Sequence, residues 1–141
     1  MKTKLSIIAL LGLFLLAGCS KEENDSAIIG SWKFYAFCNT DGTAEALTDY
    51  KECDKCFVIT GKEGGHIEGR SGMNILTGIY TSVSETKYNV TIHAETEVSE
   101  IGEGANRFLD ILPLVKSCEI RNNQLKLFYS GDEYLLFNHV N

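Results

Sequence analysis

The sequence predicts a mostly β (α+β) fold, in which an antiparallel sheet of short strands is accompanied by one helix. Three observations predict this class: short segments of alternating apolar and polar residues, turn residues between them, and one segment whose apolar residues have helical spacing. The chain of 141 residues contains 13 Gly and only one Pro, a composition that suits short strands joined by tight turns.

The first strand is expected within residues 27–38, which are aromatic and apolar nearly throughout. Residues 39–52 are polar, contain the turn dipeptide Asp41-Gly42, and are expected to form a loop. Four more strands are expected before the helix, at residues 57–60, 66–70, 73–80 and 88–92. Gly64-Gly65 is the hairpin signal between the first two of these.

The helix is expected near residues 108–115, where the apolar spacing changes to the i, i+3, i+4, i+7 pattern. The residues that follow this pattern are Phe108, Leu109, Ile111, Leu112 and Val115. Pro113 is expected to end or kink the helix, because proline lacks a backbone donor. Three strands follow at residues 118–121, 124–129 and 133–137, and Asn122-Asn123 is expected to form a two-residue hairpin turn.

The N-terminus predicts a lipoprotein signal peptide over residues 1–18. Lys2 and Lys4 precede an apolar run, residues 5–17, that is shorter than the ~20 residues of a membrane-spanning helix. Leu16-Ala17-Gly18-Cys19 matches the bacterial lipobox, in which cleavage precedes a lipidated cysteine. We therefore expect Cys19 to carry acyl chains that bind the membrane. The alternative is an ordinary secreted protein with a cysteine at this position by chance.

Residues 19–26 are expected to be the acylated cysteine and a flexible tether, followed by a single domain at 27–141. The tether is polar and charged, and cannot bury a core of its own. Its Cys-Ser-Lys-Glu-Glu stretch resembles the sorting signal of Bacteroidetes surface lipoproteins. The expected location is the outer membrane, with exposure at the cell surface left open.

The charge of the mature chain disfavours nucleic acid as a partner. Cleavage before Cys19 removes 18 residues, including Lys2 and Lys4, and changes the net charge from −6 to about −8. An acidic surface repels phosphate backbones, and no basic and aromatic cluster opposes that effect. The expected partners are the membrane, through the N-terminal lipid, and an envelope protein.

Four cysteines remain in the domain, and the sequence favours disulfides between them: Cys38, Cys53, Cys56 and Cys118. Cys53 and Cys56 form one C-x2-C pair, whereas a four-thiolate zinc site needs two such pairs. A redox-active pair would open a helix, but a strand signal follows here. The favoured pairing is Cys53–Cys56 with Cys38–Cys118, and crossed pairings stay open.

The order of these elements resembles the META/HslJ-like domain of bacterial envelope lipoproteins. The segment from Gly69 to Tyr80 resembles that family's "G…N…G-Y" stretch, and residues 108–112 resemble its helix. Residues 122–137 resemble its closing hairpin, and Cys53-Asp54-Lys55-Cys56-Phe57 is similar to a cysteine pair of the Bacteroidetes branch. The resemblance implies a small open β-barrel-like fold with one helix and no established catalytic site. The chain lacks the charged, cysteine-containing segment of the heat-shock members.

A lipocalin-like barrel is the alternative fold, because Gly30-Ser31-Trp32 resembles the G-x-W of lipocalin-like proteins. A carrier of an apolar ligand would need an open interior. The large side chains expected to face inward would instead fill it: Trp32, Phe34, Phe128 and Phe137.

No pattern in the sequence indicates catalysis, a metal site or a cofactor. His66, His93 and His139 are isolated, and the acidic run over residues 95–103 lacks the spacing of a calcium loop. We expect a non-enzymatic binding or structural protein of the envelope, with a small protease inhibitor as the alternative, acting through residues 48–56. Binding is expected in the two longest loops, residues 39–52 and 94–104, rather than in a core pocket.

Overall fold

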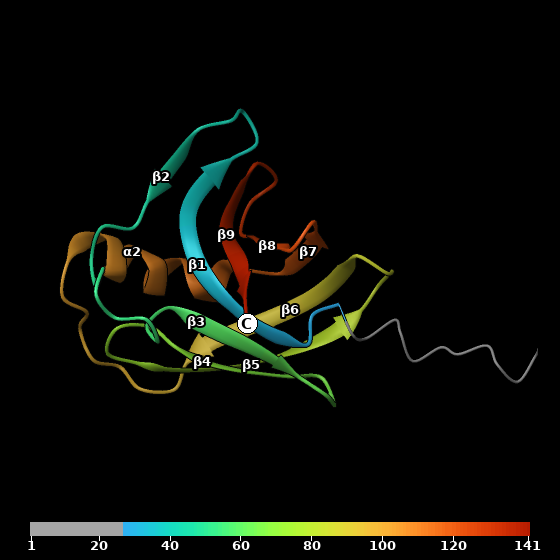
Figure 1. Cartoon of the computed structure of the whole chain (residues 1–141), viewed down its shortest axis with the longest axis horizontal. Coiled ribbons are helices and arrows are strands. Elements are labelled where there is room, and N and C mark those ends of the chain that lie inside the picture. The colour runs from blue at the N-terminus through green and yellow to red at the C-terminus, as the bar shows by residue number, and fades with distance from the viewer. Residues whose placement is uncertain (1–26) are drawn as a thin grey trace, which may run out of the picture.

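The computed structural model describes residues 27–141 and contains a closed antiparallel β-barrel with one α-helix (Figure 1). Its elements are β1 (Gly30–Asn39), β2 (Ala44–Ala46), β3 (Val58–Lys62), β4 (His66–Arg70), β5 (Ile75–Ser82), β6 (Lys87–Ala94), α2 (Glu103–Ile111), the 3-10 turn η3 (Leu112–Leu114), β7 (Ser117–Arg121), β8 (Gln124–Phe128) and β9 (Glu133–Val140). The mostly β fold with a helix is confirmed. Within the described residues, no helix is long and apolar enough to span a bilayer.

Strand pairing closes the barrel completely, whereas the META/HslJ-like resemblance implied an open one. Each of the strands from β3 to β9 pairs with its neighbour in sequence, and β1 pairs with both β3 and β9. This up-and-down closure is also the architecture of lipocalin barrels, the alternative stated above. The short β2, which lies in a segment expected to be a loop, pairs only with the C-terminal part of β1.

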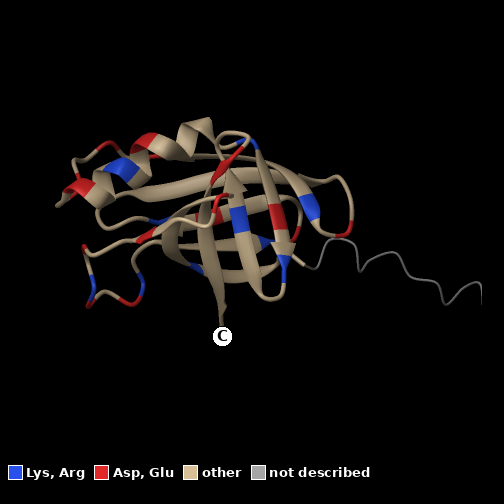
Figure 2. Cartoon of the chain, turned by 90° about the horizontal axis from the view of Figure 1, so that it is seen from above, with Lys and Arg blue, Asp and Glu red and all other residues tan. Residues whose placement is uncertain are grey.

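The two ends of the barrel differ in their connections. At the proximal end, where β1 begins and β9 ends, the neighbouring strands are joined by the short turns 63–65, 83–86 and 122–123. At the distal end lie the long connections 40–57 and 95–102, together with α2. Figures 1 and 2 show α2 on the side of the molecule away from the start of β1.

Aromatic side chains fill the distal half of the barrel interior. Phe108, on α2, is fully buried, with its ring centroid 5.0 Å from those of Phe34 and Phe57 and 6.2 Å from that of Phe137. The helix therefore closes this end of the barrel. Phe128, expected to face inward, instead lies half-buried beside Tyr134, because its register places it on the outer face.

Glycines in the barrel wall allow neighbouring backbone segments to approach closely. An added Cβ would lie 2.2 Å from the carbonyl oxygen of Ile28 at Gly61, and 2.3 Å from that of Thr91 at Gly78. No other residue fits such an approach without moving the neighbouring strand. Gly61 lies in β3 and Gly78 lies in β5.

The structure confirms one of the two favoured disulfides and contradicts the other. Cys53 and Cys56 are bonded, whereas Cys38 and Cys118 are both buried free thiols. A register shift in β1 between Phe34 and Ala36 turns Cys38 outward, beside Tyr134.

Cys118 lies opposite Leu127, whose side chain is part of the buried interior. The Cys38 and Cys118 side chains thus lie on opposite faces of the wall, with β8 and β9 between their strands. A disulfide requires Cα atoms within about 7 Å and Cβ atoms that point toward each other. The expected Cys38–Cys118 bond is therefore wrong.

Candidate functional site

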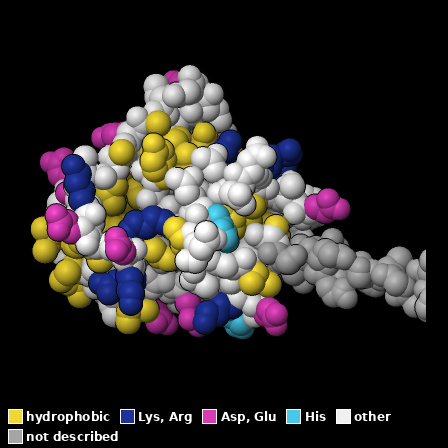
Figure 3. Space-filling model, viewed as in Figure 1, with side chains coloured by type: hydrophobic (Ala, Val, Ile, Leu, Met, Phe, Trp, Pro, Cys, Tyr) yellow, Lys and Arg dark blue, Asp and Glu magenta, His cyan; other side chains and the backbone are white. Residues whose placement is uncertain are grey.

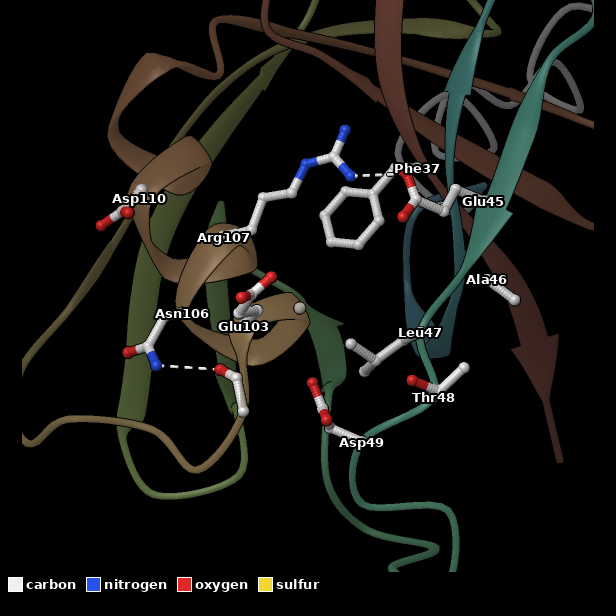
Figure 4. Close-up of a pocket in the computed structure, with 12 residues that line it drawn as sticks. Phe37, Glu45, Ala46, Leu47, Thr48, Asp49, Glu103, Asn106, Arg107 and Asp110 are labelled. Atoms are coloured by element: carbon white, nitrogen blue, oxygen red, sulfur yellow. Dashed lines mark hydrogen bonds and ion pairs between the residues drawn. The ribbon is translucent and has the colours of Figure 1, made fainter.

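The distal end carries a groove of about 800 Å³ between the β1–β2 hairpin and α2 (Figure 4). Both loops predicted to carry binding contribute to it, since Leu47, Thr48 and Asp49 form one wall and Gly102 begins the other. Its volume lies within the range typical of ligand sites. The sequence predicted the two loops but gave no sign that they meet across a helix.

Arg107 and Phe37 form one end of the groove. The Arg107 guanidinium lies 4.1 Å from the centre of the Phe37 ring, and its Nη1 is 2.8 Å from Glu45 Oε1. Both charged side chains are substantially exposed, so the ion pair itself contributes little stability. Its effect is positional, because it joins α2 to the hairpin and gives the groove a flat, partly apolar surface.

Asp49 and Tyr50 join the opposite wall to the start of α2. Asp49 Oδ2 accepts a hydrogen bond of 3.1 Å from the Ala105 N–H. This N–H belongs to the first turn of α2, whose backbone donors have no acceptor within the helix. Tyr50 Oη accepts a bond of 3.0 Å from the Ile101 N–H. Gly102 leaves room for the Asp49 side chain, since a Cβ at residue 102 would lie 2.3 Å from Asp49 Oδ1. The groove wall is thus fixed to the helix by two side chains consecutive in sequence.

Carboxylates outnumber basic groups around the groove. Its lining includes four acidic side chains, Glu45, Asp49, Glu103 and Asp110, and one basic side chain, Arg107. Along α2, acidic and basic residues alternate (Figure 2). Charged and apolar side chains gather at this end of the molecule (Figure 3). Glu45 is paired with Arg107, so the excess negative charge lies at Asp49, which accepts from the helix N-terminus, and at Glu103 and Asp110.

A buried polar network holds the 95–102 loop beside the groove. Glu100 is 5% exposed, and its carboxylate accepts hydrogen bonds from the Ser71 hydroxyl, the Met73 N–H and Asn74 Nδ2. Asn74 also accepts from the Val98 N–H at 2.8 Å and donates to the Val98 carbonyl at 2.7 Å. Glu100 belongs to the acidic run over residues 95–103, and its carboxylate is buried because these donors replace water.

Replacing Asn74 by Asp is expected to lower the free energy of unfolding by about 2–4 kcal/mol at pH 7. The change exchanges an amide donor, 2.6 Å from Glu100 Oε2, for a second carboxylate that repels it. The deficit relative to the parent should shrink at acidic pH, because protonating the introduced carboxyl removes the repulsion. Urea denaturation at several pH values measures this difference.

Asn74→Ala is the control for charge, since it removes the two hydrogen bonds that Asn74 Nδ2 donates, and also those that its Oδ1 accepts, without adding a charge. Its deficit relative to the parent should stay nearly constant over the same pH range. An Asn74→Asp protein as stable as the parent at pH 7 would contradict the role assigned to the network.

The disulfide turn lies next to the groove wall and is held by Lys33 of β1. Lys33 Nζ donates hydrogen bonds to the carbonyls of Cys53 at 2.9 Å and Cys56 at 2.5 Å. Partial burial lowers the pKa of this ammonium, and the nearby Asp54 carboxylate opposes the effect. Residues 48–56, proposed from sequence as an inhibitory segment, thus contain part of the groove wall, Thr48 and Asp49, and this turn.

The three histidines are not brought together. His66 begins β4 at the proximal end, His93 lies on the outer face of β6, and His139 packs against Trp32 with ring centroids 4.9 Å apart. Within residues 27–141, no group of three or more His, Cys, Asp or Glu side chains has the arrangement of a metal site. Cys19, the predicted lipidation site, lies outside the described residues.

No protein-family model matches the chain, and no curated protein sequence matches it. Its fold is similar to that of a protein from Burkholderia xenovorans solved by NMR, with a TM-score of 0.60 and 21% identity over 84% of this chain and 88% of that one. It is also similar to a DUF4847 family protein from Bacteroides vulgatus, with a TM-score of 0.58 and 19% identity over 85% and 98% of the two chains. Identities this low show a shared fold alone, namely a β-barrel with one helix.

Proposed function

We propose that the protein is a lipid-anchored, non-enzymatic binding protein of the outer membrane, and that the distal groove binds a basic polypeptide segment. The observation that carries this proposal is the position of the groove, at the opposite end of the barrel from the start of β1. The predicted anchor, Cys19, precedes that start. The groove would therefore face away from the bilayer.

Chain length supports this orientation. Eight residue steps separate Cys19 from Ala27, so a fully extended tether spans at most about 28 Å. The ten residues of β1 cover about 33 Å along the strand and lead from the proximal to the distal end. The tether keeps the proximal end near the membrane and leaves the groove accessible to a partner in the aqueous phase.

Charge complementarity supports a basic segment as the occupant. The Glu103 and Asp110 carboxylates flank Arg107 in sequence, and all three side chains line the groove. An extended peptide could place Lys or Arg side chains beside the two carboxylates and apolar stems against Phe37 and Leu47. The lipocalin-like carrier is less favoured, because Trp32, Phe34 and other buried side chains occupy the barrel interior. The inhibitor is less favoured because its segment is folded against the barrel through Lys33 and Tyr50.

The test uses a fluorescent octalysine peptide and the mature acylated protein in a neutral detergent at low salt. We expect saturable binding by fluorescence anisotropy. The Glu103→Gln/Asp110→Asn double variant should weaken this binding by about tenfold, because each charge contributes up to about 1 kcal/mol. A fluorescent octaglutamate peptide should not bind.

The matched control is Glu63→Gln/Glu85→Gln, which removes the same charge from exposed positions at the proximal end. This control should bind octalysine within about twofold of the parent. Equal weakening in both double variants would assign binding to net charge and would contradict the groove.

A further inference from the structure

We propose that the Cys53–Cys56 disulfide is a redox-sensitive clasp, whose reduction releases the groove wall from α2. This inference deepens the proposed function, on which it rests for the role of the groove. It requires that the disulfide be connected mechanically to the wall, that the connecting segment store strain, and that a reductant reach the bond. Each requirement has a structural counterpart.

The disulfide turn is closed locally by contacts that depend on its shape. The Cys53 N–H donates to the Tyr50 carbonyl at 3.1 Å, and the Cys56 N–H donates to the Cys53 carbonyl at 3.3 Å. The Lys33 ammonium reaches three carbonyls of the same turn, those of Cys53, Asp54 and Cys56. Three carbonyls converge on one cation only while the turn stays compact.

Two residues that bracket the turn have unfavourable backbone conformations. Tyr50 has a φ of 57° and Phe57 a φ of 58°, in the left-handed region where a side chain crowds its own backbone. Such a conformation is unfavourable for a residue with a side chain and persists only where its surroundings hold it. The disulfide lies between the two, so breaking it allows both residues to relax toward ordinary conformations.

Tyr50 transmits this change to the groove. Its ring packs against Gly72, where an added Cβ would lie 2.2 Å from the ring, and its hydroxyl accepts from the Ile101 N–H. The preceding residue, Asp49, accepts from the Ala105 N–H and lines the groove. Relaxation of the Tyr50 backbone therefore displaces both side chains that fix the wall to α2.

The bond is open to thiol–disulfide exchange at one of its cysteines. Cys53 is half-buried, whereas Cys56 is 2% exposed, so an external thiolate would attack the sulfur of Cys53. A dithiol protein of the envelope supplies the two electrons: its first thiolate forms a mixed disulfide with Cys53 and Cys56 leaves as thiolate. The second thiolate then displaces Cys53. The products are two protonated cysteines in this protein and a disulfide in the reductant.

The test measures amide hydrogen exchange by NMR on the mature acylated protein in detergent, before and after treatment with dithiothreitol. The Ile101 and Ala105 amides, which donate to Tyr50 and Asp49, should exchange at least about tenfold faster after reduction. The amides of Leu125 and Leu135 in β8 and β9 should keep their rates. The Cys53→Ser/Cys56→Ser double variant should show the fast rates without reductant and no further change with it.

Unchanged exchange at Ile101 and Ala105 after reduction would overturn the clasp. An equal loss of protection at Leu125 and Leu135 would also overturn it, because the disulfide would then support the whole fold. Octalysine binding should weaken after reduction by about tenfold or more. Should octalysine fail to bind the oxidised protein, the proposed ligand is wrong, while the exchange rates still decide the clasp.

Discussion

A Cys19→Ala protein is expected to disappear from the membrane fraction and accumulate in soluble fractions. Acyl chains bind a bilayer by burying methylene groups at about 0.8 kcal/mol each, so losing the acylated cysteine removes the whole predicted anchor. Cell fractionation on a density gradient measures the change and also separates outer from inner membranes. Mass spectrometry of the parent should show an acylated N-terminal cysteine.

Ser20→Ala is the control for this experiment, since it alters the tether and keeps the lipobox cysteine. It should fractionate with the outer membrane like the parent. If Cys19→Ala remained fully membrane-bound, the anchor would lie elsewhere, and the orientation argument for the groove would fail with it.

Phe108→Ala is expected to lower the free energy of unfolding by about 3–5 kcal/mol. The ring is fully buried and contacts the rings of Phe34, Phe57 and Phe137, which come from three other parts of the chain. Truncation leaves a cavity where α2 meets the barrel, in a domain whose total stability is typically 5–15 kcal/mol. Urea denaturation followed by far-UV circular dichroism measures the loss.

Leu114→Ala provides the comparison, because Leu114 lies just after α2 and its side chain is 54% exposed. Its effect should stay within about 0.5 kcal/mol. A similar loss in both variants would mean that the helix does not close the barrel through Phe108.

Local patterns in the sequence predicted the elements that depend on neighbouring residues. Alternation and turn dipeptides placed the strands and the Asn122-Asn123 hairpin, both of whose residues have positive φ. The helix was expected near residue 108 but begins at Glu103. Its first turn carries few apolar residues, so the apolar spacing did not indicate where the helix starts. A backbone N–H in the first turn of the helix donates to Asp49, a residue distant in sequence. No local capping residue therefore indicates the start of the helix.

Features that depend on contacts between residues far apart in sequence were not predicted. The register shift in β1 reverses the faces of the residues that follow it, and this turns Cys38 away from Cys118, with which a disulfide was expected. The groove likewise arises where Phe37, Asp49 and Arg107 meet from three separate segments. Nothing in the spacing of these residues indicates their proximity, although both loops that build the groove were identified by their length.

The pairing of β1 with β9 has a kinetic consequence. Ser31 lies opposite Val140, so residues from the two ends of the described chain must meet before the barrel is complete. Closing so long a loop costs chain entropy, and contacts between residues near in sequence do not offset that cost. Such topologies fold slowly. A chain that emerges N-terminus first cannot form this seam until its last strand is free. Translocation across a membrane in the unfolded state would therefore meet little resistance from premature folding, and the barrel would close only after release.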